Sequence, residues 1–94
     1  MPAQTFPVVH LHRLGECRGR LTLSQRGVAF TADKESGDDA FTWKPNTFTH
    51  TADEKTLTIR AEGRTYRFES AVESVAARPR QIARISSALG RVRR

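Results

Sequence analysis

The chain has 94 residues, of which 37% are hydrophobic and 28% charged, and it carries a formal net charge of +6. This length suits one modest hydrophobic core, so we expect a single domain over residues 1–94. No apolar run approaches the roughly 18 residues of a membrane span, and the first residues, MPAQTFPVV, do not resemble a secretory signal. The single cysteine, Cys17, excludes an internal disulfide and is typical of a reducing cytoplasm.

The charge is concentrated at one end of the chain. Residues 1–59 hold seven basic and seven acidic side chains, whereas residues 60–94 hold nine arginines and three glutamates. The whole net charge of +6 therefore lies in the last 35 residues. Such asymmetry indicates either an anionic partner or a solvated helix face with a basic tail.

Residues 5–14 alternate well enough to predict a first strand, with Pro7 near its start. We expect Val9 and Leu11 to face one side and the two histidines, His10 and His12, the other. Two histidines at this spacing suit a metal site if a third ligand joins them, but the pattern favours a pair of exposed or rim imidazoles. No metal and no cofactor is predicted.

Residues 18–30, RGRLTLSQRGVAF, predict a hairpin around which the rest of the chain is arranged. Leu21 and Leu23 alternate with polar residues, and Val28 and Phe30 resume the alternation after a short turn. Gly27 supplies a residue that tolerates a positive φ in this turn. Because an isolated hairpin is not stable in water, more sheet and a covering element are required.

The following residues predict an exposed acidic loop at 32–39, short strands at 40–44 and 48–50, and a turn at 51–55. A last hairpin is expected at 56–61 and 64–69, joined by Glu62-Gly63. Threonines flank the apolar positions throughout and are expected to point outward or to the rim: Thr22, Thr31, Thr42, Thr49, Thr58 and Thr65. About seven short antiparallel strands at this spacing indicate a mainly β domain, as a barrel or sandwich.

After residue 69 the apolar period becomes helical. Ser70 to Glu73 is a capping-box pattern that predicts a short first turn from Ala71, with a break before Pro79 and a main helix over 79–92. One side of this helix is apolar and is expected to cap the barrel: Ile82, Ile85, Leu89 and Val92. The opposite side is basic, and residues 79–94 therefore form a capping helix with a basic tail: Arg80, Arg84, Arg91 and Arg94.

Seven strands and one closing helix in about a hundred residues resemble the pleckstrin-homology-like (PH-like) barrel, and the chain looks like a small bacterial member. The resemblance depends on GRLTLSQRGVAF, on FTW at 41–43, on LTIRAEGRTYRF and on the amphipathic helix, and it spans about residues 5–92. The chain departs from the eukaryotic members in the helix, where Ile82, Ile85 and Leu89 replace their usual tryptophan.

The resemblance implies a candidate anion site at Arg13, Arg18 and Arg20, which are similar to the basic residues that grip phosphates in lipid-binding members. Glu16 lies in the same region and would oppose an anion. Many members of this fold are scaffolds that bind a protein, a peptide or a neighbouring domain along a strand edge or beside the helix.

The sequence has no Gly-rich phosphate loop, catalytic triad pattern or metal-ligand spacing, so an enzyme is not predicted. The leading hypothesis is a non-catalytic module that binds a protein or peptide partner, with a homodimer through a sheet edge as a further option. The alternative is electrostatic binding of a phosphorylated lipid headgroup, an anionic membrane surface or a nucleic acid through the arginine clusters. The basic stretch itself lacks the interleaved aromatic residues that stack on bases.

Overall fold

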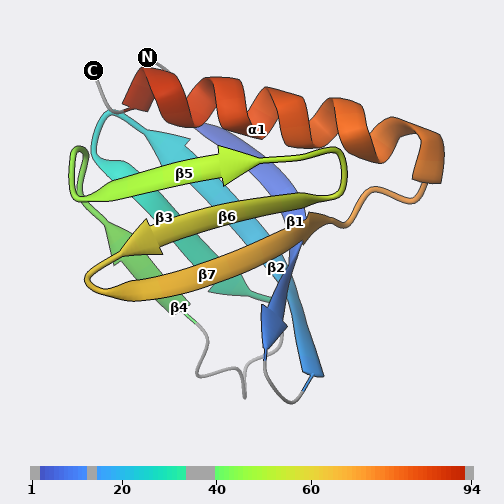
Figure 1. The fold of residues 1–94 in the computed structure, drawn as a ribbon, viewed down its shortest axis with the longest axis horizontal. Coiled ribbons are helices and arrows are strands. Elements are labelled where there is room, and N and C mark those ends of the chain that lie inside the picture. The colour runs from blue at the N-terminus through green and yellow to red at the C-terminus, as the bar shows by residue number, and fades with distance from the viewer. Residues whose placement is uncertain (1–2, 13–14, 34–39, 93–94) are drawn as a thin grey trace.

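A computed structural model describes residues 3–12, 15–33 and 40–92 of the chain. These residues form seven strands and one α-helix, preceded by a short 3-10 helix (Figure 1). In chain order the elements are β1 (Gln4–His12), β2 (Gly15–Ser24), β3 (Gly27–Ala32), β4 (Ala40–Trp43), β5 (Phe48–Ala52), β6 (Thr56–Ala61), β7 (Arg64–Ser70), η1 (Val75–Ala77) and α1 (Arg78–Val92). The mainly β prediction with a C-terminal helix is confirmed.

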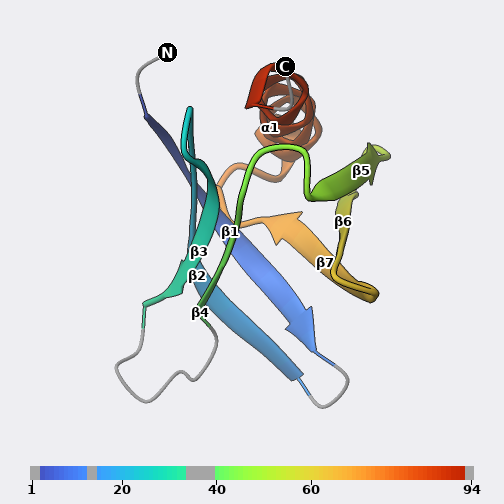
Figure 2. The same ribbon diagram turned by 90° about the vertical axis from the view of Figure 1, so that its left-hand side faces the viewer.

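All seven strands belong to one antiparallel sheet with the order β4-β3-β2-β1-β7-β6-β5. β1 pairs with β2 along its length and with β7 from Val8 to Leu11, so the sheet folds at this strand. Figure 2 shows β1–β4 on one side, β5–β7 on the other, and α1 across the opening between them. The sheet has two ends, at β4 and β5, and in the described residues it is an open, folded sheet rather than a closed barrel.

The hydrophobic core lies between the two halves of the sheet and α1. It takes side chains from every strand and from the helix: Val8, Leu21, Leu23, Val28, Phe30, Trp43, Phe48, Leu57, Ile59, Ala61, Phe68, Ile82, Ile85, Ala88, Leu89 and Val92. The alternation predicted for the central hairpin is confirmed, since Leu21, Leu23, Val28 and Phe30 are all buried. The six threonines predicted to lie outward or at the rim are exposed or half-buried.

The helix buries the apolar side that its period predicts. Ile82, Ile85, Leu89 and Val92 are each at most 4% exposed. Burying four such side chains stabilises the fold by about 1.5–3 kcal/mol each. Pro79 is the second residue of α1, where its missing N–H is not needed, as predicted.

The prediction of a helical turn from Ala71 is wrong. Residues 71–74 are not helical, and the 3-10 helix begins only at Val75. Ser70 is instead buried, where its hydroxyl accepts from the Val72 N–H at 3.3 Å and donates to the side-chain carbonyl of Gln81. A capping box requires its serine at the N-cap of a helix, whereas here Ser70 is the last residue of β7 and joins that strand to α1.

Two turns adopt the backbone conformations that their glycines predict. Gly27, at the β2–β3 turn, has φ +130°, and Glu62 and Gly63 at the β6–β7 turn have φ +54° and +76°. A positive φ at both central residues is the usual arrangement of a two-residue hairpin turn. Strand β5 extends through Thr51 and Ala52 into the predicted turn at 51–55.

His10 faces away from Val9 as predicted, but the expectation that it is exposed is wrong. Phe6 and Val8 face the core cluster, and His10, only 7% exposed, lies on the same side of the strand. Antiparallel pairing decides this, because Phe6 lies opposite the buried Leu21, and His10 lies opposite the buried Phe68. Apolar residues occur on both faces of this strand, so the sequence period alone does not determine which face is buried.

Candidate functional site

Two of the three arginines of the candidate anion site lie in the described part of β2. Arg13 lies outside the described residues, whereas Arg18 and Arg20 are exposed on the outer face of β2, on either side of the buried Gly19. The Arg20 Nε lies 3.7 Å from the Asp33 Oδ1, in an ion pair whose side chains are 68% and 52% exposed. The same Asp33 and Glu16 line a hollow of about 340 Å³ next to Arg18. The negative charges of Asp33 and Glu16 disfavour anion binding at this face.

The histidines take different positions from those expected. The His10 ring lies 5.1–6.0 Å, centroid to centroid, from the rings of Phe30, Phe41, Phe68 and Tyr66. His10 is thus part of an aromatic cluster rather than an exposed imidazole, and the side chain of His12 lies outside the described set. In the part of the chain that the structure describes, no group of three or more His, Cys, Asp or Glu side chains is placed to hold a metal ion.

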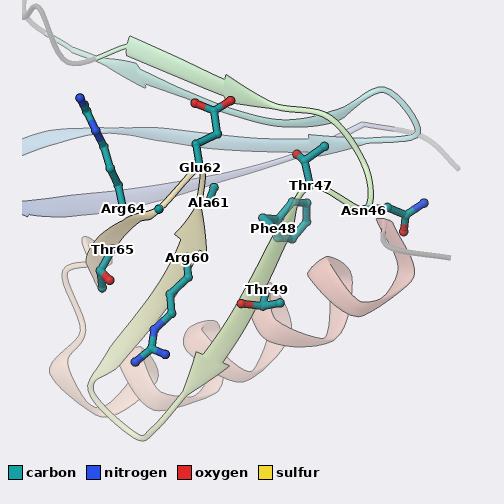
Figure 3. A pocket seen from close by; sticks show the side chains of 10 residues that line it. Asn46, Thr47, Phe48, Thr49, Arg60, Ala61, Glu62, Arg64 and Thr65 are labelled. Atoms are coloured by element: carbon teal, nitrogen blue, oxygen red, sulfur yellow. The ribbon is translucent and has the colours of Figure 1, made fainter.

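Two hollows lie over β5 and its neighbours. One of about 520 Å³ opens between the β4–β5 connection and the β6–β7 turn, where ten residues line it: Asn46, Thr47, Phe48, Thr49, Arg60, Ala61, Glu62, Gly63, Arg64 and Thr65. Figure 3 shows that Arg60 and Arg64 point in opposite directions, with Arg60 beside Thr49. The two guanidinium groups therefore do not converge on a common ligand position.

A second hollow, of about 560 Å³, lies between the end of β5 and α1. Its strand side is made of Ala52, Asp53 and Glu54, and its helix side is made of Pro79, Ile82, Ala83, Ser86 and Ser87. A smaller hollow of about 230 Å³ shares Glu54 and Pro79 with it and includes Val75, which is 69% exposed. Together they form a groove along α1, which we call the β5–α1 groove.

The backbone of β5 is oriented for a further strand at this groove. β5 ends the sheet order and pairs with β6 on its other side. The Asp53 N–H donates to the Thr56 carbonyl at 3.0 Å, which fixes the alternation of the ladder. Because hydrogen-bonded and non-hydrogen-bonded pairs alternate along an antiparallel ladder, Thr51 directs its N–H toward β6 and Ala52 directs its N–H toward the outer edge.

The β5–β6 turn next to the groove is held by Asp53. Its carboxylate accepts the Thr56 N–H at 2.7 Å and the Lys55 N–H at 2.8 Å. These two backbone hydrogen bonds, first from Thr56 and then from Lys55, lower the pKa of Asp53, with a smaller contribution from the Lys55 charge. The turn therefore places a carboxylate at one end of the groove.

The predicted basic side of the helix is present on α1. Arg80, Arg84 and Arg91 are exposed, while Arg94 lies outside the described residues. Arg84 and Arg91 border a hollow of about 370 Å³ whose other lining residues are Gln4, Phe6 and Ser87. This hollow opens toward β1, so Arg84 and Arg91 lie on the flank of the helix opposite the β5–α1 groove, and Ser87 borders both hollows.

The sequence alone did not predict the β5–α1 groove or the hollow bordered by Arg84 and Arg91. The β5–α1 groove brings together residues about 30 positions apart in the chain, and the hollow at Arg84 and Arg91 brings together residues about 80 positions apart. Local periodicity carries no signal for such pairs. Across the described ranges, no helix has the length and apolar content needed to cross a membrane.

No protein-family model matches the chain, and no curated protein matches it in sequence. Among solved structures, the chain is similar to the crystal structure of the C-terminal domain of an unknown protein from Leishmania infantum. The similarity has a TM-score of 0.64 at 10% sequence identity, and it covers 92% of this chain and 81% of that chain. At this identity the likeness shows a shared fold. In this chain, that fold consists of seven antiparallel strands and a closing helix.

Proposed function

We propose that the protein is a non-catalytic interaction module of the PH-like type, which binds an extended segment of a protein partner along the outer edge of β5. The observation that carries this proposal is that the sheet ends at β5 directly beside the β5–α1 groove. An added strand gains main-chain hydrogen bonds from the edge, and a neighbouring groove receives its alternate side chains.

The lining of the groove supports a peptide with small or apolar side chains. Ala83, Ser86 and Ser87 give the helix side little bulk, and Ile82 contributes apolar surface at its buried base. Val75, exposed next to the adjoining hollow, provides a further apolar contact. Residues on the outer side of an added strand would remain in solvent, so alternate positions of the peptide carry the specificity.

The edge is tested by a proline substitution that leaves the sheet intact. Ala52→Pro removes an N–H that points away from β6, and proline is tolerated at such edge positions. Thr51→Pro removes an N–H that points toward β6 and therefore serves as the destabilising comparison. Peptides are selected from a random library on the wild-type protein, and their affinities are then measured for each variant that retains the wild-type circular dichroism spectrum.

The groove is tested separately with a matched pair of tryptophans. Ala83→Trp fills the β5 flank of α1, and Arg80→Trp places the same bulk on the other exposed flank. We expect Ala52→Pro and Ala83→Trp to weaken the selected peptides at least roughly tenfold, with Arg80→Trp close to wild type. In the NMR spectrum of the ¹⁵N-labelled protein, the same peptides are expected to shift the amide signals of residues 48–54 and 79–87. Selected peptides that bind both groove variants as well as wild type would refute the proposal.

A further inference from the structure

The hollow between β1 and α1 brings together residues from opposite ends of the chain. Gln4 and Phe6 come from the first half of β1, and Arg84, Ser87 and Arg91 come from α1. It lies on the flank of the helix away from β5 and shares only Ser87 with the groove to which the peptide proposal applies. We call it the β1–α1 hollow.

The charged side chains that line the β1–α1 hollow are all basic. Among the described residues that line the hollow, none is acidic, and the whole of α1, RPRQIARISSALGRV, contains no Asp or Glu. Arg80, Arg84, Ser87 and Arg91 follow one another at spacings of four, three and four residues, which places them in a single line along the helix. At 1.5 Å per residue this line is about 16 Å long. It presents a row of positive charge to a linear anion.

The polar groups of the hollow are those that contact phosphodiester backbones. Guanidinium, hydroxyl and side-chain amide groups supply most side-chain hydrogen bonds to phosphate oxygens. Arg84 and Arg91, Ser87 and Gln4 provide these three kinds of donor within one concave surface. An arginine binds a phosphate through two parallel N–H groups, which lysine does not do.

Phe6 adds the aromatic surface that the helix lacks. Its side chain is half-buried, packs against the core cluster and lines the hollow together with Gln4, Arg84 and Arg91. Aromatic rings next to a basic groove stack on unpaired bases, whatever the sequence of the strand. An amphipathic surface binds a bilayer through apolar side chains that protrude into the interface, whereas Phe6 is half-buried and lines a hollow. The combination therefore favours a single-stranded nucleic acid over an anionic bilayer.

We propose that the β1–α1 hollow binds single-stranded nucleic acid, with the phosphates along the arginine line of α1 and a base against Phe6. The formal net charge of +6 and the sequence pI of about 10.7 bring such a polyanion to the protein. Because the hollow and the β5–α1 groove lie on opposite flanks of α1, this proposal does not depend on peptide binding.

The test measures the fluorescence anisotropy of labelled twelve-nucleotide oligo(dT) and oligo(rU) with the full chain at several salt concentrations. Arg84→Gln/Arg91→Gln is the test variant. Arg60→Gln/Arg64→Gln is the control, because it removes the same charge from exposed positions beside the β6–β7 turn. We expect the test variant to weaken binding roughly tenfold or more, since it loses two charged hydrogen-bonding partners. The logarithmic salt slope is expected to become shallower by about 1.4, or 0.7 for each lost phosphate contact.

The control pair is expected to change affinity less than threefold. Equal weakening by the two pairs would overturn the proposal, because binding would then follow overall charge rather than the hollow. The absence of oligonucleotide binding to wild type at low salt would overturn it as well. Both outcomes leave the peptide proposal standing, since neither pair alters β5 or the β5–α1 groove.

Stacking is tested with Phe6→Leu and Phe6→Trp, each compared by thermal melting with wild type. We expect Phe6→Leu to weaken single strands about fivefold or more and Phe6→Trp to retain binding, because only the tryptophan keeps an aromatic face. A duplex of the same length is expected to respond little to either change. The third arm is cosedimentation with vesicles of phosphatidylcholine and phosphatidylserine. Vesicle binding that Arg84→Gln/Arg91→Gln removes, without oligonucleotide binding, would assign the hollow to a membrane surface and refute the proposal.

Discussion

Ser70 donates a hydrogen bond from its hydroxyl to the side-chain carbonyl of Gln81, which joins the end of β7 to the first turn of α1 at a buried site. The Gln81 Nε2 in turn donates to the Pro7 carbonyl in β1 at 3.3 Å, and the Ala71 N–H donates to the same carbonyl at 3.1 Å. The start of the helix is therefore fixed to both β1 and β7, where the sheet folds.

Replacing Gln81 with leucine tests this connection. The substitution keeps most of the volume and leaves the Ser70 hydroxyl without its acceptor, so we expect the free energy of unfolding to fall by about 1–3 kcal/mol. Ser87→Leu, at an exposed position of the same helix, is expected to change it by less than about 0.5 kcal/mol. Urea denaturation measures both. A Gln81→Leu protein as stable as wild type would show that these hydrogen bonds add little.

The apolar side of α1 is expected to carry much of its contribution to stability. Ile85 is fully buried, and Ile85→Ala should lower the free energy of unfolding by about 2–5 kcal/mol because it leaves a cavity. Its neighbour Arg84 is exposed, and Arg84→Ala should stay within about 0.5 kcal/mol of wild type. Deletion of residues 79–94 should abolish cooperative melting. A truncated chain that melts as sharply and as high as the intact chain would refute the capping role.

Gly27 and Gly63 form a matched pair for the two turns. Both have a positive φ, but a Cβ at Gly27 would meet the carbonyl oxygen of Trp43 in β4, whereas the space around Gly63 is open. Gly63→Ala is therefore expected to cost about 1–2 kcal/mol, from the backbone conformation alone. Gly27→Ala is expected to cost more, because the β3–β4 pairing must also shift. Equal melting temperatures for the two variants would contradict this reading of the β2–β3 turn.

The Asp53 turn is expected to weaken in acid. Its pKa is lowered in the folded protein by the Thr56 and Lys55 N–H groups, so the carboxylate binds protons more readily in the unfolded chain. The stability that it contributes is present above the ordinary aspartate pKa of about 4 and is lost as the pH falls through the lowered value. Melting temperatures between pH 7 and pH 2 should therefore fall less steeply for Asp53→Asn than for wild type. Parallel curves would exclude a contribution from this group.

The strands and the helix are the parts of the fold that local pattern predicted well. In β2 and β3 the alternation of Leu21, Leu23, Val28 and Phe30 matches burial directly, because every second side chain of a strand faces the core. In β1 the same reasoning failed, since Val8 and Val9 are adjacent and either alternation appears apolar. The pairing of Phe6 with Leu21 decided it.

The candidate sites were harder to predict than the elements. Arg18 and Arg20 do share a face of β2, as their spacing predicts, but only the fold shows Asp33 beside Arg20. The arginine line of α1 follows from its period, whereas its aromatic neighbour, Phe6, comes from the other end of the chain. Ionic and aromatic neighbours of this kind depend on strand order and helix docking.

The sequence by itself determined which segments become strands, where two of the turns need glycine, and which side of the terminal helix is apolar. These properties follow from the burial period of each segment and from backbone sterics, both of which act over a few residues. Only the tertiary structure decided that His10 enters the aromatic cluster, that Gln81 bonds to Ser70, and that the sheet stays open at β5. Each depends on contacts between residues distant in the chain, whose free energies become available only when the sheet folds and α1 packs across it.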